Sequence, residues 1–346
     1  MEKKKIRLGM IGAGGFAYSH LNGIKGLDCA EIVAISDIDI EMAKEKSEIY
    51  NIPFYYHDHL ELLARDDIDA VTLLLPDQVH AQIAIDAMRA GKHVLCEKPM
   101  ALTKEDCSNM VKTARETGMQ LMIGQIGRYT PAFVKAKEIV DSGEIGELMF
   151  IESEYAHDYS KLGGAGGWRV TPERHPILGG GCHAIDLIRM IAGNPEEVFA
   201  YANNKVLVDW PINDTTVAIM KFPNGAIGKV FNSHGCKRRY TMRTVVQGTK
   251  GTLIFDNSNR DISIYMDEFR GEDGYFGSAQ RNVEMRIEVQ VNNHNTEAEI
   301  KDFCQYLLNG EPVKTDGVEG ASTVAVGLAI VESVETGLPV KVDYNF

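Results

Sequence analysis

The stretch Lys5–Ala17, "KIRLGMIGAGGFA", decides the fold of the first part of the chain. It begins with an almost continuous apolar run, which is typical of a strand buried on both faces of a parallel sheet. It ends with Gly12, Gly14 and Ala17 as a G-x-G-x-x-A motif before a helical pattern. Gly12 permits a tight turn, Gly14 lets the backbone approach a pyrophosphate, and Ala17 keeps the helix close to the sheet. We therefore predict a dinucleotide site.

The rest of the first third alternates strand and helix patterns. Further strands are expected at 31–37, near 54, and at 69–76, 92–99 and 120–125, with helices at 40–50, 77–91 and 103–118. This rhythm predicts an α/β Rossmann fold, a doubly wound parallel sheet, over residues 1–125.

The remainder, residues 126–346, predicts an α+β domain with a large open, mainly antiparallel sheet. We expect a helix at 131–143, a strand at 147–159, a glycine-rich loop at 160–181 and a helix from 182. Strands dominate 198–290, and two helices close the chain at 295–308 and 318–336. The hairpin at 217–231 carries Asn224-Gly225, which indicates a type I′ turn.

Composition excludes several classes of protein. The chain has 346 residues, 44% hydrophobic and 25% charged, which is typical of a globular protein. The net charge, 36 − 49 = −13, argues against nucleic acid or an anionic membrane as a partner. The apolar run near the N-terminus is short and broken by glycines, and no run reaches the ~18 residues of a membrane span. Six scattered cysteines without C-x-x-C spacing predict a cytoplasmic location.

Asp37 ends the second expected strand, 25 residues after Gly12. A carboxylate there accepts hydrogen bonds from a ribose 2′-hydroxyl and repels a 2′-phosphate. Ile38 and Asp39 follow it, without an Arg or Lys to neutralise that phosphate. The sequence therefore predicts NAD as the cofactor in preference to NADP.

The motif "CEKP", Cys96–Pro99, lies at the carboxyl end of the fifth strand, where ligands gather in this architecture. Lys98 could supply a cation there, or a proton to an oxygen if burial lowers its pKa.

Five segments carry a family resemblance: "GAGGFA", "AISDID", "LLPDQVHAQIAIDAMRAGKHVLCEKPMALT", "IGQIGRYTPAFVKAKEIVDSGEIGEL" and "GCHAIDLIRMIAG". The chain resembles the Gfo/Idh/MocA (glucose–fructose oxidoreductase/inositol dehydrogenase) family, closely in its first half and loosely to its end. The resemblance implies a Rossmann domain followed by a substrate-binding and oligomerisation domain. It also implies an NAD(P)-dependent dehydrogenase acting on CH–OH groups of sugars, polyols or cyclitols.

The same resemblance makes Lys98 the catalytic lysine and Glu97 its companion, with Pro76, Asp77 and His80 near the nicotinamide. The expected cofactor-binding set is Gly12, Gly14, Gly15, Phe16, Ala17, Asp37, Pro76, Asp77, His80, Glu97 and Lys98.

Many members of the family carry an Asp-x-x-x-His pair, whose spacing places both side chains on one helical face. Here the pair is broken and two registers are open. In the favoured one, His183 is the catalytic histidine and Gly179 stands at the aspartate position. In the other, Asp186 is the aspartate and Met190 stands at the histidine position. In the favoured register Asp186 has a structural, hydrogen-bonding role.

Polar residues that precede the expected helix at 182 are candidates to contact the substrate, and Trp168 could cover a sugar-sized ring. This candidate substrate set is Arg128, His157, Asp158, Trp168, Arg169 and His175. We predict no metal site, since the one H-x-H pair, His57 and His59, has no further ligands in sequence. A Cys182–His183 nucleophile is disfavoured because neighbouring helical positions point apart.

Three functions follow, in order of preference. The first is an NAD-dependent oxidoreductase transferring hydride between nicotinamide and a hydroxyl or carbonyl carbon of a sugar, cyclitol or glycoside, with Lys98 and His183 handling the proton. The second is an enzyme that retains NAD and cleaves glycosides through transient oxidation. The third is a non-catalytic sensor of dinucleotide or sugar. By resemblance, a homodimer or homotetramer forms through the C-terminal sheet.

Overall fold

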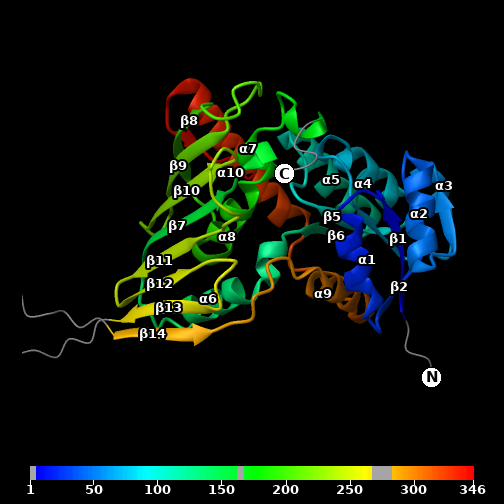
Figure 1. The fold of residues 1–346 in the computed structure, drawn as a ribbon, viewed down its shortest axis with the longest axis horizontal. Helices are drawn as coiled ribbons and strands as arrows, with labels where there is room; N and C mark the ends of the chain where they lie inside the picture. Colours follow the sequence, from blue (N-terminus) through cyan, green and yellow to red (C-terminus); the bar gives the residue numbers. More distant parts are fainter. Residues whose placement is uncertain (1–4, 162–166, 267–282) are drawn as a thin grey trace, which may run out of the picture. The chain divides into compact units, whose positions relative to one another are not determined.

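A computed structural model describes residues 5–161, 167–266 and 283–346, and the chain forms two compact units (Figure 1). The first unit contains residues 1–126, 295–328 and 343–346, and the second contains 127–294 and 329–342. The division after Ile126 lies one residue from the expected boundary. Two later segments return to the first unit, however, whereas the sequence pattern assigned everything after residue 125 to one domain.

The first unit is built on a six-stranded parallel sheet in the order β3-β2-β1-β4-β5-β6, which confirms the Rossmann fold. Its strands are β1 (Ile6–Ile11), β2 (Ala30–Ser36), β3 (Phe54–Tyr56), β4 (Ala70–Leu73), β5 (His93–Glu97) and β6 (Leu121–Gly124). Its helices in this part are α1 (Ala17–Lys25), α2 (Ile40–Tyr50), α3 (His59–Leu63), the 3₁₀ turn η1 (Asp77–Val79), α4 (His80–Arg89) and α5 (Lys104–Thr117). The strand order reverses at β1, between β2 and β4, and such a reversal is where this architecture binds its ligands.

Helix α9 (Thr296–Asn309) completes the first unit by packing against α1. Gly23 makes the approach possible, since a Cβ there would come within 3.1 Å of the Glu297 nitrogen. Asn295 caps α9 by accepting a hydrogen bond from the Ala298 amide.

Helix α10 (Gly317–Thr336) contributes residues to both units. It is long and apolar enough to cross a membrane by composition, although no such segment was apparent from the sequence pattern. Because 67% of its most apolar window is buried, we assign it to the protein core.

The second unit contains a nine-stranded sheet in the order β14-β13-β12-β11-β7-β10-β9-β8-β15. Only β7 and β10 pair in parallel, so the predicted mainly antiparallel sheet is confirmed. The strands are β7 (Leu148–Ala156), β8 (Glu197–Asn203), β9 (Thr215–Lys221), β10 (Ile227–Ser233), β11 (Thr244–Gly248), β12 (Gly251–Phe255), β13 (Asp261–Met266), β14 (Val283–Glu288) and β15 (Val340–Lys341). The helices are α6 (Pro131–Asp141), α7 (Pro176–Gly179) and α8 (Cys182–Ala192), with 3₁₀ turns η2 (Ile126–Tyr129), η3 (Tyr159–Lys161) and η4 (Gly167–Val170).

The β9–β10 hairpin is confirmed, but its turn is not type I′. Gly225 has φ +84°, whereas Asn224 does not adopt a positive φ, which type I′ requires at both central residues. Two expected regions lie partly outside the described residues: the glycine-rich loop at 162–166 and the strand-rich part at 267–282.

Helix α8 packs on β7 and β10, and α6 packs on β12 and β13. The opposite face of the sheet carries apolar side chains that remain exposed. Tyr201, Val217 and Ile219 lie on this face, which follows from the register of β8 against β9.

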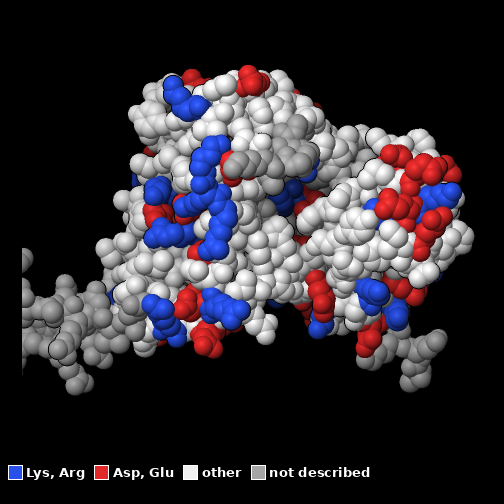
Figure 2. All heavy atoms as spheres, viewed as in Figure 1, with Lys and Arg blue, Asp and Glu red and all other residues white. Residues whose placement is uncertain are grey.

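Basic side chains gather on the second unit in Figure 2. Several of these contact acids on β7 or just after it. Lys229 and Arg243 contact Glu152, Arg238 contacts Glu154, and Lys237 contacts Asp158. These pairs offset the positive charge at this surface.

Candidate active site

The glycine motif forms a tight turn with an open approach. Gly12 has φ +103°, and a Cβ there would lie 2.2 Å from the Leu74 carbonyl oxygen. Its amide donates to the Ser36 carbonyl at 2.8 Å, which joins the ends of β1 and β2. A Cβ at Gly14 or Gly15 would meet nothing within 4 Å. The space in front of α1 therefore fits a pyrophosphate held at a helix N-terminus.

Asp37 lies beside this turn. Its carboxylate accepts hydrogen bonds from the Ala13 amide at 2.6 Å and the Asp39 amide at 2.9 Å. These bonds hold an anion directly after β2, where a ribose 2′-hydroxyl is recognised in this architecture. Phe16, from the expected cofactor set, is 39% exposed at the start of α1.

Lys98 is the first residue after β5 and is half-buried, next to a cis peptide bond to Pro99. His80 joins this segment to the end of β4. Its Nδ1 lies 2.9 Å from the Pro99 carbonyl oxygen, and its Nε2 lies 3.0 Å from the Leu75 carbonyl oxygen. His80 and Asp77 are both buried, so His80 supports the two strand ends that carry Pro76 and Lys98.

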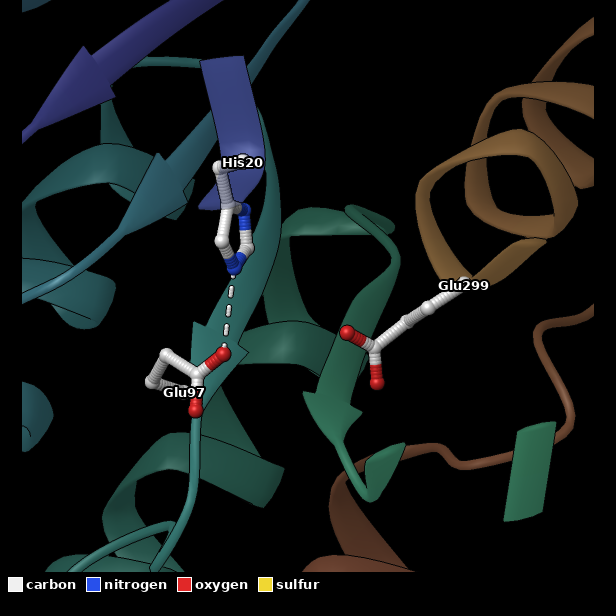
Figure 3. A group of neighbouring side chains, drawn as sticks. All are labelled: His20, Glu97 and Glu299. Carbon is white, nitrogen blue, oxygen red and sulfur yellow. Dashed lines mark hydrogen bonds and ion pairs between the residues drawn. The ribbon is translucent and has the colours of Figure 1, made fainter. Parts of the chain in front are cut away.

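Two further residues contribute to this region, and the sequence pattern revealed neither role. His20 Nε2 lies 3.1 Å from the Glu97 carboxylate, and Glu299 of α9 points toward that pair (Figure 3). Burial would raise the pKa of Glu97, but the hydrogen bond from His20 and the charge of Lys98 bring it below its usual value. Glu97 therefore carries the negative charge beside Lys98.

The glycines before α8 belong to a nearly continuous helical segment. Gly180 and Gly181, which lie between α7 and α8, both have right-handed helical angles. Gly179 and His183 are one turn apart on that segment and share a face. Asp186 and Met190, the pair of the other register, have the same spacing on α8, so the helical geometry is common to both registers.

Each of these glycines makes room for a side chain. A Cβ at Gly180 would lie 2.5 Å from the Tyr155 ring and 2.6 Å from the His234 ring. A Cβ at Gly179 would lie 2.5 Å from the Arg174 guanidinium, which is 5% exposed. An arginine thus occupies the space beside the position where the family resemblance expects an aspartate.

His183 lies in an aromatic cluster of the second unit. The cluster consists of Tyr155, His157, Tyr159, His183, His234 and Tyr240. The His183 ring stacks on Tyr155 with centroids 5.6 Å apart and an interplanar angle of 14°. Burial raises the pKa of the Tyr155 and Tyr240 phenols, so both remain neutral donors. Tyr155 and His157 are two residues apart on an extended chain and so share one face. This spacing is the sequence pattern from which part of the cluster could have been predicted.

Among the candidate substrate residues, Arg128 has a protein partner. Its Nε and Nη2 donate to the two oxygens of Asp186 at 2.9 and 2.7 Å. This agrees with the structural role expected for Asp186. Asp158 pairs with Lys237 at 3.0 Å, and hydrogen bonds from Ser160 and Lys237 lower its pKa to about 2.

The other candidates surround the glycine-rich segment. His157 hydrogen-bonds the Tyr155 hydroxyl at 3.2 Å, and burial lowers its pKa to about 4, so it is neutral at pH 7. Arg169 lies 4.0 Å over the Trp168 ring. His175 precedes α7 and lines a pocket with Ile330 and Glu335, and burial lowers its pKa.

Two alternatives receive no support from these contacts. His59 contacts the carboxylates of Asp58 and Asp86, and His57 and His59 are not part of a group of three or more possible metal ligands among the described residues. The Cys182 thiol donates to the Gly179 carbonyl oxygen at 3.3 Å within its own helix.

A Rossmann unit with this glycine turn, joined to a mainly antiparallel sheet, defines a dinucleotide-dependent oxidoreductase. Residues 6–125 match the Gfo/Idh/MocA oxidoreductase family with NAD-binding Rossmann fold, and residues 133–254 match the C-terminal domain of the same family. The chain belongs to this family and is an NAD(P)-dependent dehydrogenase of CH–OH groups.

Relatives extend over the whole chain. Myo-inositol 2-dehydrogenase from Thermotoga maritima is 30% identical, covering 98% of this chain and 99% of its own length. Inositol 2-dehydrogenase from Rhizobium meliloti is 29% identical, covering 95% and 97%. The structure of levoglucosan dehydrogenase with NADH and levoglucosan has a TM-score of 0.89 at 23% identity, covering 99% of this chain and 100% of that one, which supports the fold.

We predict that Gly12→Ala destabilises the protein by about 1–3 kcal/mol and weakens NADH binding, because an alanine would combine a strained φ with a backbone clash. Gly15→Ala is the matched control, since its Cβ enters open space. Urea unfolding and calorimetric titration with NADH measure both effects. Equal stability of the two variants would contradict the prediction.

Proposed function

We propose that the protein is an NAD-dependent dehydrogenase of a sugar, cyclitol or glycoside hydroxyl, in which Lys98 and His183 handle the proton. The observation that carries the proposal is Lys98, half-buried directly after β5 beside the anionic Glu97. The relatives named for inositol and levoglucosan support this substrate class.

In the oxidative direction, a nicotinamide dinucleotide held at the glycine turn and Asp37 would supply the hydride acceptor for the carbinol carbon. His183 takes the proton from the hydroxyl group, while Lys98 donates a hydrogen bond to the same oxygen. The stacked Tyr155 ring keeps the His183 imidazole in one orientation. The remaining rings of the aromatic cluster offer apolar faces and hydroxyl groups suited to a polyhydroxylated ring.

Replacing Lys98 tests the assignment. We expect Lys98→Met to reduce turnover by ~10²–10⁴, the usual contribution of a positioned acid or base, while the dissociation constant of NADH changes little. The substrate panel comprises inositols, sugars and anhydrosugars, with NADH absorbance as the signal. Lys112→Met, at a side chain 72% exposed, is the control. Unchanged turnover in Lys98→Met would reject the role.

The preference for NAD is a proposal that depends on the charge of Asp37. We expect Asp37→Asn to bind NADP at least tenfold more tightly than the wild type, because repulsion of the 2′-phosphate disappears. Asparagine retains an oxygen that can accept from the Ala13 amide, so the turn should persist. Dissociation constants for both cofactors measure the change. A wild type that prefers NADP would overturn the proposal.

A second candidate is an enzyme that retains NAD and cleaves a glycosidic bond through transient oxidation. The observation that favours it is Arg174 beside Gly179, since this helical face lacks the expected carboxylate. NAD copurifying with the protein, and cleavage products without net NADH, would select this candidate. Binding of dinucleotide and sugar without any turnover would instead favour a sensor.

We also propose a cytoplasmic homodimer or homotetramer formed through the exposed face of the C-terminal sheet. Exposed apolar residues support the interface: Tyr201 is 72% exposed, Ile219 53% and Ile227 52%. We expect Ile219→Glu to dissociate the oligomer in sedimentation velocity, since a charge would be buried. Val208→Glu, outside the strands at 66% exposure, is the control. A wild-type monomer would contradict the proposal.

A further inference from the structure

Glu299 is the one fully buried acid of α9, and its carboxyl group faces another acid. Its relative exposure is 0%, and neither carboxyl oxygen has a hydrogen-bond partner among the described residues. Oxygen atoms of Glu299 and Glu97 and a ring nitrogen of His20 all lie within 4.8 Å of one another. Figure 3 shows Glu299 reaching from α9 toward the His20–Glu97 pair.

Two buried carboxylates at this separation cannot both ionise cheaply. Burial raises the pKa of Glu299 and the charge of Glu97 raises it further, while Lys98 opposes them. The pKa of Glu97 is lowered instead, because His20 and Lys98 favour the charged form of this carboxyl group, with a smaller contribution from His80. These four groups, with Glu299, are the titratable residues that act on the cluster. The pKa values of the two acids are therefore shifted in opposite directions, downward for Glu97 and upward for Glu299.

We propose that Glu299 is a positioning residue for Lys98: its neutral carboxyl group limits the buried cluster of His20, Glu97 and Glu299 to a single negative charge. The inference rests on the proposed function only in taking Lys98 as the catalytic group. A second carboxylate would draw the Lys98 ammonium toward the interior. A neutral carboxyl leaves the hydrogen-bond donors of Lys98 available to the substrate oxygen.

The same donor types are found around divalent metal ions. The structure favours a proton over a metal ion at this place, because the Lys98 cation acts on both carboxylates and would repel a second cation. The divalent metal content of the wild type and of the Glu299 variant is therefore measured as part of the test.

The first measurement is stability against pH for Glu299→Gln, a neutral side chain of nearly the same shape. In the unfolded chain a glutamate ionises near pH ~4.3. Because the folded pKa is higher, stability from the neutral acid is present below that pH and is lost as pH rises toward the folded pKa. We expect the variant to match the wild type near pH ~4. Above pH ~5, it should gain about tenfold in the folding equilibrium constant per pH unit, up to the folded pKa.

Urea unfolding between pH 4 and 8 provides this comparison. Glu311→Gln, at an exposed position just after α9, is the control and should show no such gain. A Glu299→Gln variant less stable than the wild type at pH 7 would overturn the proposal, because it would show that Glu299 is an ionised partner. So would a stoichiometric divalent metal ion that is lost in the variant.

The second measurement separates positioning from packing. We expect the kcat of the wild type to fall as pH rises through the folded pKa of Glu299, because the second carboxylate then competes for Lys98, whereas Glu299→Gln should keep its kcat over the same range. If the two pH profiles of kcat coincide, or if Glu299→Gln lowers kcat at least tenfold at pH 7, the proposal fails. If the wild type turns over no substrate, the proposed function fails, whereas the pH dependence of stability still reports the charge of Glu299.

Discussion

The close approach of β1 to β4 is the constraint on which the rest of the first unit depends. At Gly12 the backbone turns with φ +103° against the Leu74 carbonyl oxygen, and no side chain has room there. The turn directs the chain from the sheet into α1 and leaves the amide end of that helix facing open space. It also places Ala13 where Asp37 can hold it, and this bond ties the loop to the adjacent strand.

In the second unit, too, glycines stand where another group leaves no room for a side chain, but here that group is a side chain and not the backbone. Around α7 and α8, the absent side chains of Gly179 and Gly180 are replaced by larger groups from elsewhere, namely Arg174, Tyr155 and His234. The helical segment therefore presents His183 against the Tyr155 ring and Gly179 against the Arg174 guanidinium. Chemically, this surface combines stacking faces with a buried cation, which differs from the acid–histidine pair that the family resemblance implies.

The sequence predicted the Rossmann sheet well because each of its signals is local. Apolar runs, the glycine motif and the Thr103 cap all act within a few residues. Lys98 could be placed because the strand count fixed its position. Contacts between distant segments were not readable, among them Glu299 against Glu97 and Tyr155 against Gly180. The Asn224-Gly225 turn was misassigned because the same pair can place a positive φ on glycine alone.

The return of residues 295–328 to the first unit affects how the protein can be made. During synthesis, the strands of the Rossmann sheet leave the ribosome long before α9, yet α9 packs on α1 and brings Glu299 close to Glu97. A fragment ending near residue 126 would lack α9 and so would expose the packing surface around Gly23 and remove Glu299 from the His20–Glu97 pair. The first unit is thus completed only when most of the chain has emerged. Because residues 127–294 of the second unit precede α9, they are synthesised before the first unit can finish folding.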